Sequence, residues 1–320
     1  MKTIAIIGEC MIELNGKPFG AMQQTYGGDT LNAAVYLSRS CETAAIEHPI
    51  KVCYVSALGS DPLSNGLKAH WNEEGVNTDL VLIDDKRTPG LYLIQLDEVG
   101  ERTFLYWRDQ SAAKYLLEHP DFKKIESRLY SAQMVFISGI SLAILPDDDR
   151  NKLVALLHKL RAKGVEIAFD SNYRPALWPD DQLSTVKNIY SATYETTDLA
   201  LVTFDDEHLI WGDRTPQATI ERLHQSGVKK VVVKLGAQGC LTSESSSVDP
   251  ILVSTQPVKN VVDTTSAGDS FNGGFLSAYL AGKSIKRSCH RGNALAGKVI
   301  QHPGAIIQRA HTNEITKTFK

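Results

Sequence analysis

The feature that most constrains the fold is a regular alternation of short apolar runs with amphipathic stretches. Six runs are rich in β-branched residues and continuously apolar, as expected for strands that are buried on both faces of a parallel sheet. They span residues 4–7, 52–57, 134–138, 165–169, 200–203 and 231–235. Between two of them, Leu153, Leu156, Leu157 and Leu160 recur at helical spacing, and Gly164 follows as a stop signal. This alternation predicts a doubly wound α/β fold.

One region breaks the alternation. Leu91–Leu96 and Arg102–Arg108 are two strand-like runs with no helix between them, which predicts an antiparallel hairpin. A three-residue loop over Glu98–Gly100, with its glycine at positive φ, would place Asp97 opposite Glu101.

The same register places Tyr92 opposite Tyr106 and Gly90 opposite Arg108. Because side chains alternate along a strand, all four positions lie on one face, together with Ile94 and Phe104. An aromatic face that ends in an arginine has two interpretations: it packs on a core, or it forms a lid that touches a ligand.

Charge and cysteine content exclude several classes of partner. The chain has 34 Lys+Arg against 37 Asp+Glu, a net charge of −3, which argues against nucleic-acid or membrane binding but leaves room for a small anion. No apolar stretch approaches the roughly 18 residues typical of a membrane span. Five cysteines without a CxxC pair are typical of reduced thiols, so we expect a cytoplasmic protein.

The segment Asp263–Phe275 has the strongest chemical pattern. A loop of small residues leads directly into a helix, so the backbone amides of Ser266, Ala267 and Gly268 converge near a helix N-terminus. This arrangement suits the charge on a transferred phosphoryl group. Asp269 lies at the edge of the loop, where it can take a proton from an attacking hydroxyl. The alternative for Asp269 is a helix N-cap.

A second segment, Tyr26–Val35, contains a glycine pair before a helix. Gly27 and Gly28 allow a sugar to approach the backbone, and Asp29 and Asn32 offer partners for its hydroxyls. The alternative is a tight turn with Asp29 as the N-cap.

Three further polar segments follow predicted strands, where ligands bind in open α/β sheets. Asp170–Pro175 contains an asparagine and an arginine. Lys234–Gly239 contains a Gly-x-x-Gly turn, which is weak evidence by itself. Phe204–Glu207 is an acidic run that either begins a solvated helix or orients a metal near phosphate.

In this order, the segments resemble the ribokinase-like (PfkB) carbohydrate kinases over nearly the whole chain. The matching motifs are Gly27–Asn32, Ala57–Asp61 with Gly66 and Gly75-Val76, and Asp263–Asp269. Within that family, the chain is most similar to kinases of 2-keto-3-deoxygluconate. The stretches that carry this similarity are Ile7–Leu14, Pro89–Tyr92, Gly100–Phe104, Tyr106–Arg108, Ser138–Leu145 and Asn172–Pro175.

The resemblance implies a ribokinase-like, mostly parallel sheet with helices on both faces and a small β-sheet lid. It implies one domain over 1–320, with the lid built from about 9–26 and 86–110, and a homo-oligomer formed through the lid. Sugar lies between body and lid, and ATP with Mg²⁺ is the phosphoryl donor. The expected reaction is ATP-dependent phosphorylation of the 6-hydroxyl of 2-keto-3-deoxygluconate; the alternatives are a fructokinase or ribokinase, or a non-catalytic sugar-binding regulator.

The resemblance also assigns residues. Asp269 is the general base, and the amides of Ser266, Ala267 and Gly268 hold the moving phosphate. The sugar site comprises Gly27, Gly28, Asp29, Asn32, Tyr92, Tyr106, Arg108 and Arg174. The nucleotide site comprises Asn172, Lys234, Gly236, Ala237, Gly239 and Asn293. Glu207 positions Mg²⁺ through water, and Asp263 and Thr265 supply oxygens for a monovalent cation such as K⁺.

Two residues depart from the family pattern. Ser266 replaces the first glycine of the Gly-Ala-Gly-Asp loop, so the backbone there must adopt angles open to a side chain. Phe204 replaces the asparagine of Asn-x-x-Glu, which leaves Glu207 alone beside the metal. Arg108 and Arg174 favour an acidic sugar, because a charged hydrogen bond contributes about 1.5–3 kcal/mol.

Overall fold

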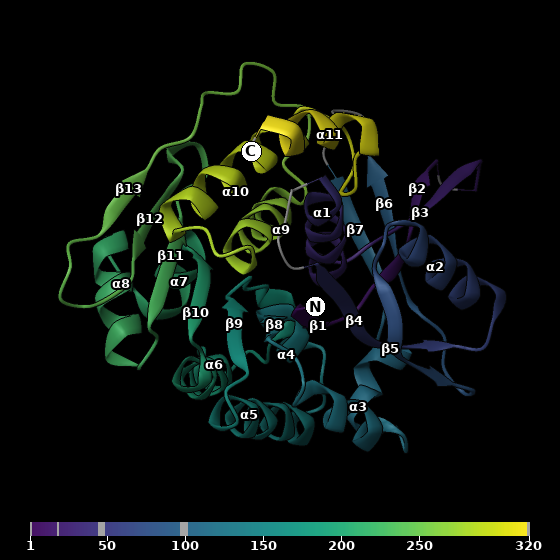
Figure 1. The fold of residues 1–320 in the computed structure, drawn as a ribbon. Coiled ribbons are helices and arrows are strands. Elements are labelled where there is room, and N and C mark those ends of the chain that lie inside the picture. Colours follow the sequence, from purple (N-terminus) through teal and green to yellow (C-terminus); the bar gives the residue numbers. More distant parts are fainter. Residues whose placement is uncertain (1, 18, 44–48, 97–101, 319–320) are drawn as a thin grey trace.

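A nine-stranded sheet forms the body of the protein (Figure 1). The computed structural model describes residues 2–17, 19–43, 49–96 and 102–318. The strands of this sheet are β1 (Lys2–Ile7), β4 (Ile50–Gly59), β5 (Asn77–Asp84), β8 (Met134–Ser138), β9 (Glu166–Asp170), β10 (Leu199–Thr203), β11 (Lys230–Lys234), β12 (Cys240–Ser243) and β13 (Ile251–Val253). Their order is β13-β12-β11-β10-β9-β8-β1-β4-β5, and all neighbouring strands pair in parallel except β12, which is antiparallel to both β11 and β13.

Helices cover both faces of this sheet. They are α1 (Asp29–Thr43), α2 (Pro62–Glu73), α3 (Phe122–Leu129), α4 (Gly139–Ala143), α5 (Asp147–Ala162), α6 (Ser184–Thr196), α7 (Phe204–Trp211), α8 (Pro216–Gln225), α9 (Ala267–Leu280), α10 (Ile285–Val299) and α11 (Arg309–Thr318). Short 3₁₀ helices span Ala112–Glu118, Pro175–Leu177 and Gly236–Gln238. Figure 1 shows α1, α9 and α10 together on one side of the sheet, with α4, α5 and α6 on the other.

The strands are apolar throughout because successive side chains enter two different cores. On β1, Ile4 and Ile6 pack into the cluster that contains Phe271 and Phe275 of α9. Ala5 and Ile7 pack into the cluster under α5 and α6. A strand buried on both faces has no polar side, which is the pattern that the sequence displays.

All six predicted strands are confirmed to within two residues at each end. The sequence analysis did not identify β5, nor the antiparallel edge formed by β12 and β13. β5 and β13 are the two edge strands of the sheet and are partly exposed to solvent, and β12 is a short strand of four residues. The ribokinase-like α/β architecture is nevertheless the one expected.

A separate four-stranded sheet lies beside the body, in the order β3-β2-β6-β7. Two distant parts of the chain build it: β2 (Met11–Gly16) with β3 (Met22–Gly27), and β6 (Gly90–Leu96) with β7 (Arg102–Trp107). We call this sheet the lid. β2 pairs in parallel with β6 and joins the two parts.

The predicted hairpin register is confirmed, since Tyr92 pairs with Tyr106 and Ile94 with Phe104. The rings of Tyr92, Phe104 and Tyr106 lie on one face, with centroids 5.9–6.4 Å apart. The predicted Glu98–Gly100 loop and the Asp97–Glu101 pair lie outside the described residues.

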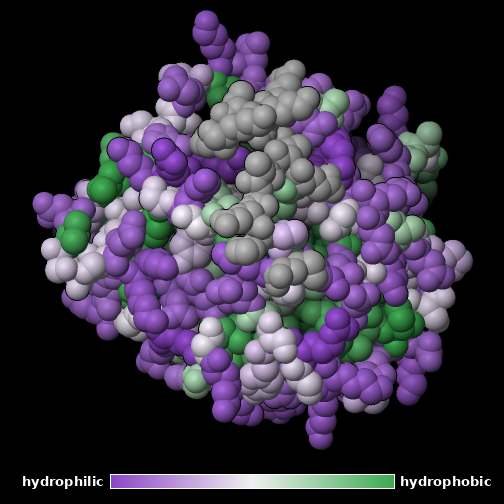
Figure 2. Space-filling view, in the orientation of Figure 1, coloured by the Kyte–Doolittle hydropathy of each residue, from purple (hydrophilic) through white to green (hydrophobic). Residues whose placement is uncertain are grey.

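Hydrophilic residues dominate the face in Figure 2, with hydrophobic ones in small groups. Among the described residues, no helix is both long enough and apolar enough to cross a membrane.

Gly273 allows α9 to pack directly against α1, which provides a test of this packing. A Cβ at Gly273 would lie 2.7 Å from the Tyr36 Cβ and 2.8 Å from the Ala33 carbonyl oxygen. We expect Gly273→Ala to lower the free energy of unfolding by about 1–3 kcal/mol, because a helix backbone must move. Denaturant unfolding measures this change.

Gly66 in α2 is the matched control, since a Cβ there meets nothing within 4 Å. Gly66→Ala should stabilise the protein by about 0.5–1 kcal/mol through helix propensity. Equal effects of the two substitutions would contradict the close approach of α1 and α9.

Candidate active site

The N-terminus of α9 opens at the carboxyl edge of the large sheet. Ser266 precedes the helix in the left-handed region, with φ 63° and ψ 15°. A side chain tolerates these angles at a cost of roughly 1–2 kcal/mol, so serine can replace the family's glycine without a different loop shape. The Ala267 amide donates to the Thr264 carbonyl at 3.2 Å. The amides of Gly268 and Asp269 belong to the first turn, which has no intrahelical acceptor for them.

Asp269 lies in this first turn, against α1. Asn32 Nδ2 donates to Asp269 Oδ2 at 2.8 Å, so α1 holds the carboxylate in place. Burial, together with the charge of nearby Asp29, raises the pKa of Asp269 to about 7, while the Asn32 hydrogen bond lowers it. A carboxylate with that pKa can both accept and release a proton near neutral pH.

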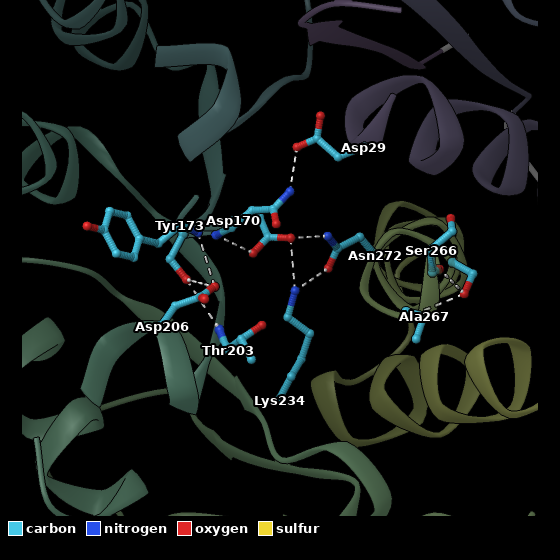
Figure 3. A network of polar contacts seen from close by, with 12 residues as sticks. Asp29, Asp170, Tyr173, Thr203, Asp206, Lys234, Ser266, Ala267 and Asn272 are labelled. Carbon is cyan, nitrogen blue, oxygen red and sulfur yellow. Dashed lines mark hydrogen bonds and ion pairs between the residues drawn. The ribbon is translucent and has the colours of Figure 1, made fainter. Parts of the chain in front are cut away.

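A buried ion pair lies behind this helix (Figure 3). Lys234 Nζ, at the end of β11, donates to Asp170 Oδ2 at 2.9 Å. Asn272 Nδ2, from α9, donates to the same oxygen at 2.6 Å, and Lys234 lies 3.5 Å from Asn272 Oδ1. Two strand ends and the helix that carries Asp269 are therefore joined at one carboxylate.

Asn172 connects this ion pair to the glycine-rich segment. Its backbone has φ 30°, an unusual value for a residue with a side chain, and its amide donates to Asp170 Oδ1 at 3.3 Å. Its Nδ2 donates to Asp29 Oδ2 at 2.6 Å. The structure thus places Asn172 beside Asp29, while the resemblance assigns it to the nucleotide.

A cavity of about 430 Å³ lies on the other side of the α9 N-terminus. Its walls are largely apolar, with Pro257, Val258 and Ile300 among the lining residues. It brings together seven predicted residues: Lys234, Gly236, Ala237, Gly239, Ala267, Gly268 and Asn293. The cavity therefore joins an apolar region to a helix N-terminus, as a nucleotide base and its phosphates require.

The glycine pair is required by close packing within the protein, against backbone at Gly28 and against a tyrosine side chain at Gly27. A Cβ on Gly28 would collide with the Glu9 carbonyl, and one on Gly27 would lie 3.0 Å from the Tyr92 hydroxyl. This close packing brings α1, which carries Asp29 and Asn32, next to the lid.

The aromatic face of the lid carries polar groups as well. The Tyr92 hydroxyl donates to Glu13 Oε2, and the Thr25 hydroxyl donates to Glu13 Oε1 at 2.9 Å. Tyr92 is buried, whereas Tyr106 is 53% exposed at the open end. The structure thus leaves the Tyr106 ring free to contact a ligand.

The two predicted arginines lie in different surroundings. Arg108 donates from Nε to Glu9 Oε2 at 2.9 Å and from Nη2 to the same oxygen, and both side chains are nearly buried. Arg174 is exposed, and its Nη1 donates to the Tyr173 carbonyl at 2.9 Å. Within the described part of the chain, no carboxylate forms a direct ion pair with Arg174, although its charge lowers the pKa of nearby Asp206, so the exposed guanidinium can still contact a ligand.

Glu207 is fully buried, and both of its carboxylate oxygens have protein partners. Tyr194 donates to Oε1 and Arg222 Nη2 to Oε2, each at 2.6 Å. The neighbouring Asp206 accepts from the Tyr173 amide at 3.2 Å and from the Ser171 hydroxyl at 3.4 Å. Burial and the charge of Asp170 raise the pKa of Asp206 to about 6. A cation bound beside Asp206 would weaken the repulsion between the Asp206 and Asp170 carboxylates.

Asp263 ties the loop before α9 to the loop before α11. Its Oδ1 accepts from the Thr265 amide at 3.0 Å and its Oδ2 from the Gly304 amide at 2.8 Å. The carboxylate therefore orders the loop that leads to Ser266.

Sequence reasoning assigned no individual role to Glu9, Glu13, Asp170, Asp206 or Asn272, although each lies in a segment that it named. Asp170 is the last residue of β9, and Asn272 is a buried polar residue of α9. The pairing of these two residues across 102 residues of chain was not visible in the sequence.

A helix N-terminus with an adjacent carboxylate, a cavity beside it and a strand lid suit the transfer of a phosphoryl group to a small molecule. The pfkB family of carbohydrate kinases matches residues 1–313, so the chain belongs to that family.

Its relatives include kinases of one sugar acid. The chain is 52% identical over 319 residues to a 2-dehydro-3-deoxygluconokinase of Haemophilus influenzae, which covers 100% of both chains. It is 45% identical over 308 residues to the 2-dehydro-3-deoxygluconokinase of Dickeya dadantii, which covers 96% of this chain and 97% of the relative. The fold also matches an Escherichia coli protein solved with ATP and Mg²⁺, with TM-score 0.79, 23% identity and coverage of 100% and 99%.

The pKa of Asp269 leads to a kinetic prediction. Asp269→Asn should lower kcat by about 10²–10⁴ with a modest change in KM, because an amide cannot accept the proton. In the wild type, kcat/KM should fall as the pH drops below about 7, where Asp269 is protonated. Steady-state kinetics between pH 5 and pH 9 measure both effects.

Asn32→Ala is the companion variant. It removes a hydrogen bond that favours the ionised carboxylate, so the pKa of Asp269 should rise. The fall of kcat/KM at acid pH should therefore begin at a higher pH than in the wild type. A near wild-type kcat in Asp269→Asn would contradict the role of Asp269. An unchanged pH dependence of kcat/KM in Asn32→Ala would contradict it as well.

Proposed function

We propose that this chain phosphorylates the 6-hydroxyl of 2-dehydro-3-deoxygluconate, also called 2-keto-3-deoxygluconate, with ATP. The observation that carries the proposal is the 52% identity, over the full length of both chains, to a 2-dehydro-3-deoxygluconokinase. None of the five cysteines, all of which lie in the described segments, forms a disulfide. We therefore place the reaction in a reducing compartment, the cytoplasm.

Phosphoryl transfer in this site depends on positioning and electrostatics. Asp269 takes the proton from the sugar hydroxyl as that oxygen attacks the terminal phosphoryl group of ATP. The N-terminus of α9, at Ser266–Gly268, faces the charge that grows on the phosphoryl oxygens. Lys234 and the 430 Å³ cavity hold the rest of the nucleotide.

Two cations complete the proposal. Mg²⁺ neutralises charge on the nucleotide phosphates, and a related fold has been solved with ATP and Mg²⁺. We assign Asp206 to the Mg²⁺ side of the site, because Glu207 is fully buried and its charge is already balanced by the Arg222 guanidinium. Oxygens of Asp263 and Thr265 offer a place for K⁺ at the loop before α9.

The carboxylate of the sugar acid requires a cation. Arg174 is exposed and forms no direct ion pair among the described residues, although Asp206 lies near enough to interact with its charge, whereas Arg108 is paired directly with buried Glu9. Arg174 is therefore the main electrostatic partner of the substrate carboxylate, and Arg108 contributes hydrogen bonds from the lid to uncharged oxygens of the sugar. A coupled assay of ADP release over sugar acids and neutral sugars tests the substrate; turnover of fructose or ribose without the sugar acid would overturn the proposal.

Arg174→Ala isolates the carboxylate interaction. We expect KM for the sugar acid to rise about tenfold or more, since a charged hydrogen bond is worth about 1.5–3 kcal/mol, with little change for an uncharged analogue. Arg174→Lys retains the charge and should recover part of the loss. Arg108→Ala should also lower Tm, because it leaves Glu9 buried without its partner. Equal losses for charged and uncharged substrates would remove Arg174 from carboxylate recognition.

The outer face of the lid is proposed as the contact between copies of this chain. Leu105 and Trp107 lie on the side of β7 opposite to Tyr106 and are 39% and 59% exposed. An isolated small sheet leaves such apolar area uncovered.

A double substitution tests the contact. Leu105→Glu with Trp107→Glu should convert the wild-type oligomer to a monomer, because burying two carboxylates in an apolar interface is costly. Size-exclusion chromatography with light scattering measures the mass. A monomeric wild type, or an unchanged mass in the variant, would rule out the lid as the interface.

A further inference from the structure

Glu9 lies where the chain passes from the body to the lid. It is between β1 of the large sheet and β2 of the lid, and its side chain is only 1% exposed. Arg108 follows β7, at the point where the chain leaves the lid again. The Glu9–Arg108 ion pair therefore joins two of the chain's crossings between lid and body.

Only one of the two Glu9 oxygens is used in this ion pair. Arg108 donates to Oε2 from both Nε and Nη2. Oε1 is buried and has no hydrogen-bond partner among the described residues. A buried carboxylate oxygen without a donor destabilises the folded protein, so its retention points to a donor that a ligand supplies.

Gly90 shows where Oε1 lies. A Cβ on Gly90 would be 2.7 Å from Oε1 and 3.2 Å from the Arg108 Cβ. Because side chains alternate along β6, that Cβ would point to the same face as Tyr92 and Ile94. Oε1 thus takes the place of a side chain at position 90, on the lid face that carries the aromatic rings.

We propose that Glu9 is a specificity-determining residue that accepts a hydrogen bond from a sugar hydroxyl through Oε1, while Oε2 fixes Arg108. The proposal deepens the proposed function and rests on it. A carboxylate accepts but does not donate, so it binds a hydroxyl and repels the carboxylate of the substrate. Glu9 therefore directs the hydroxyl-bearing part of the sugar toward Gly90 and the acidic end toward Arg174.

The substitution Glu9→Gln tests the role of Oε1 separately from the role of Oε2. Arg108 offers only donors, so the single amide oxygen of glutamine turns toward Arg108. The position of Oε1 is then taken by an NH₂ group, which cannot accept the hydroxyl hydrogen. The variant retains the contact with Arg108 and removes the acceptor.

We expect Glu9→Gln to raise KM for the sugar at least tenfold, with KM for ATP changed less than twofold. Initial rates at varied sugar and at varied ATP separate the two. The second measurement uses substrate analogues that each lack one hydroxyl. The wild type should lose affinity for one of them by a similar factor, and Glu9→Gln should show no further loss for that analogue, because the interaction is already absent.

Two variants keep the test independent of folding defects. Asp149→Asn changes a comparable pair on α5, in which Oδ1 accepts from Lys152 and buried Oδ2 has no hydrogen-bond partner among the described residues, and it should leave both KM values unchanged. Gly90→Ala displaces Oε1 without altering any charge and should raise KM for the sugar as Glu9→Gln does. If Glu9→Gln does not fold, Gly90→Ala carries the test.

The outcomes distinguish this proposal from the proposed function. The wild type is assayed first, and failure to phosphorylate the sugar acid refutes the proposed function whatever Glu9 does. The Glu9 proposal is overturned if sugar KM stays within twofold in Glu9→Gln and Gly90→Ala. It is also overturned if the KM for the sugar and the KM for ATP rise together. A third contrary result is that, for every analogue, the loss of affinity from the missing hydroxyl adds to the loss from Glu9→Gln.

Discussion

The buried contact of Asp170 with Lys234 and Asn272 is the interaction on which the rest of the site depends. It joins β9, β11 and α9 at one carboxylate oxygen, so the helix that carries Asp269 is anchored to the strand ends. Removing one partner of such a pair leaves an uncompensated charge in the interior, at a typical cost of about 3–5 kcal/mol. The pair also places Lys234 in the wall of the 430 Å³ cavity, so in the proposed function the same ammonium group anchors the helix and faces the nucleotide.

The second constraint is the lid. A four-stranded sheet cannot bury both of its faces, and here its inner face carries aromatic rings while its outer face leaves apolar area exposed. Because β2-β3 and β6-β7 come from separate parts of the chain, the lid crosses to the body several times. Charged side chains near these crossings, Glu9 and Arg108, serve as fixed contacts between the two sheets. Closure over a sugar can then exclude water from the phosphoryl transfer.

Much of the fold was predictable from sequence because burial on both faces leaves an uninterrupted apolar signal in each central strand. The hairpin register was predictable as well, since turn length and alternation determine which residues face each other. Edge strands such as β5 and β13 were missed because solvent on one side breaks the signal. Within the site, the loop before Asp269 was evident from its run of small residues. The partners of Arg108 and Glu207 were not, because each is supplied by a distant segment.

The sequence by itself determined the α/β class, the hairpin and the identity of the segments at strand ends, since these follow from local periodicity and small-residue loops. Only the tertiary structure determined which groups surround each charged side chain. In the folded chain, Arg108 pairs with Glu9 and Arg174 is exposed. Glu207 is buried between Tyr194 and Arg222, and the pKa of Asp269 is raised to about 7. The physical reason is that electrostatic interactions act through space and depend on burial, and neither the neighbours of a charge nor its solvent exposure is encoded in its sequence position.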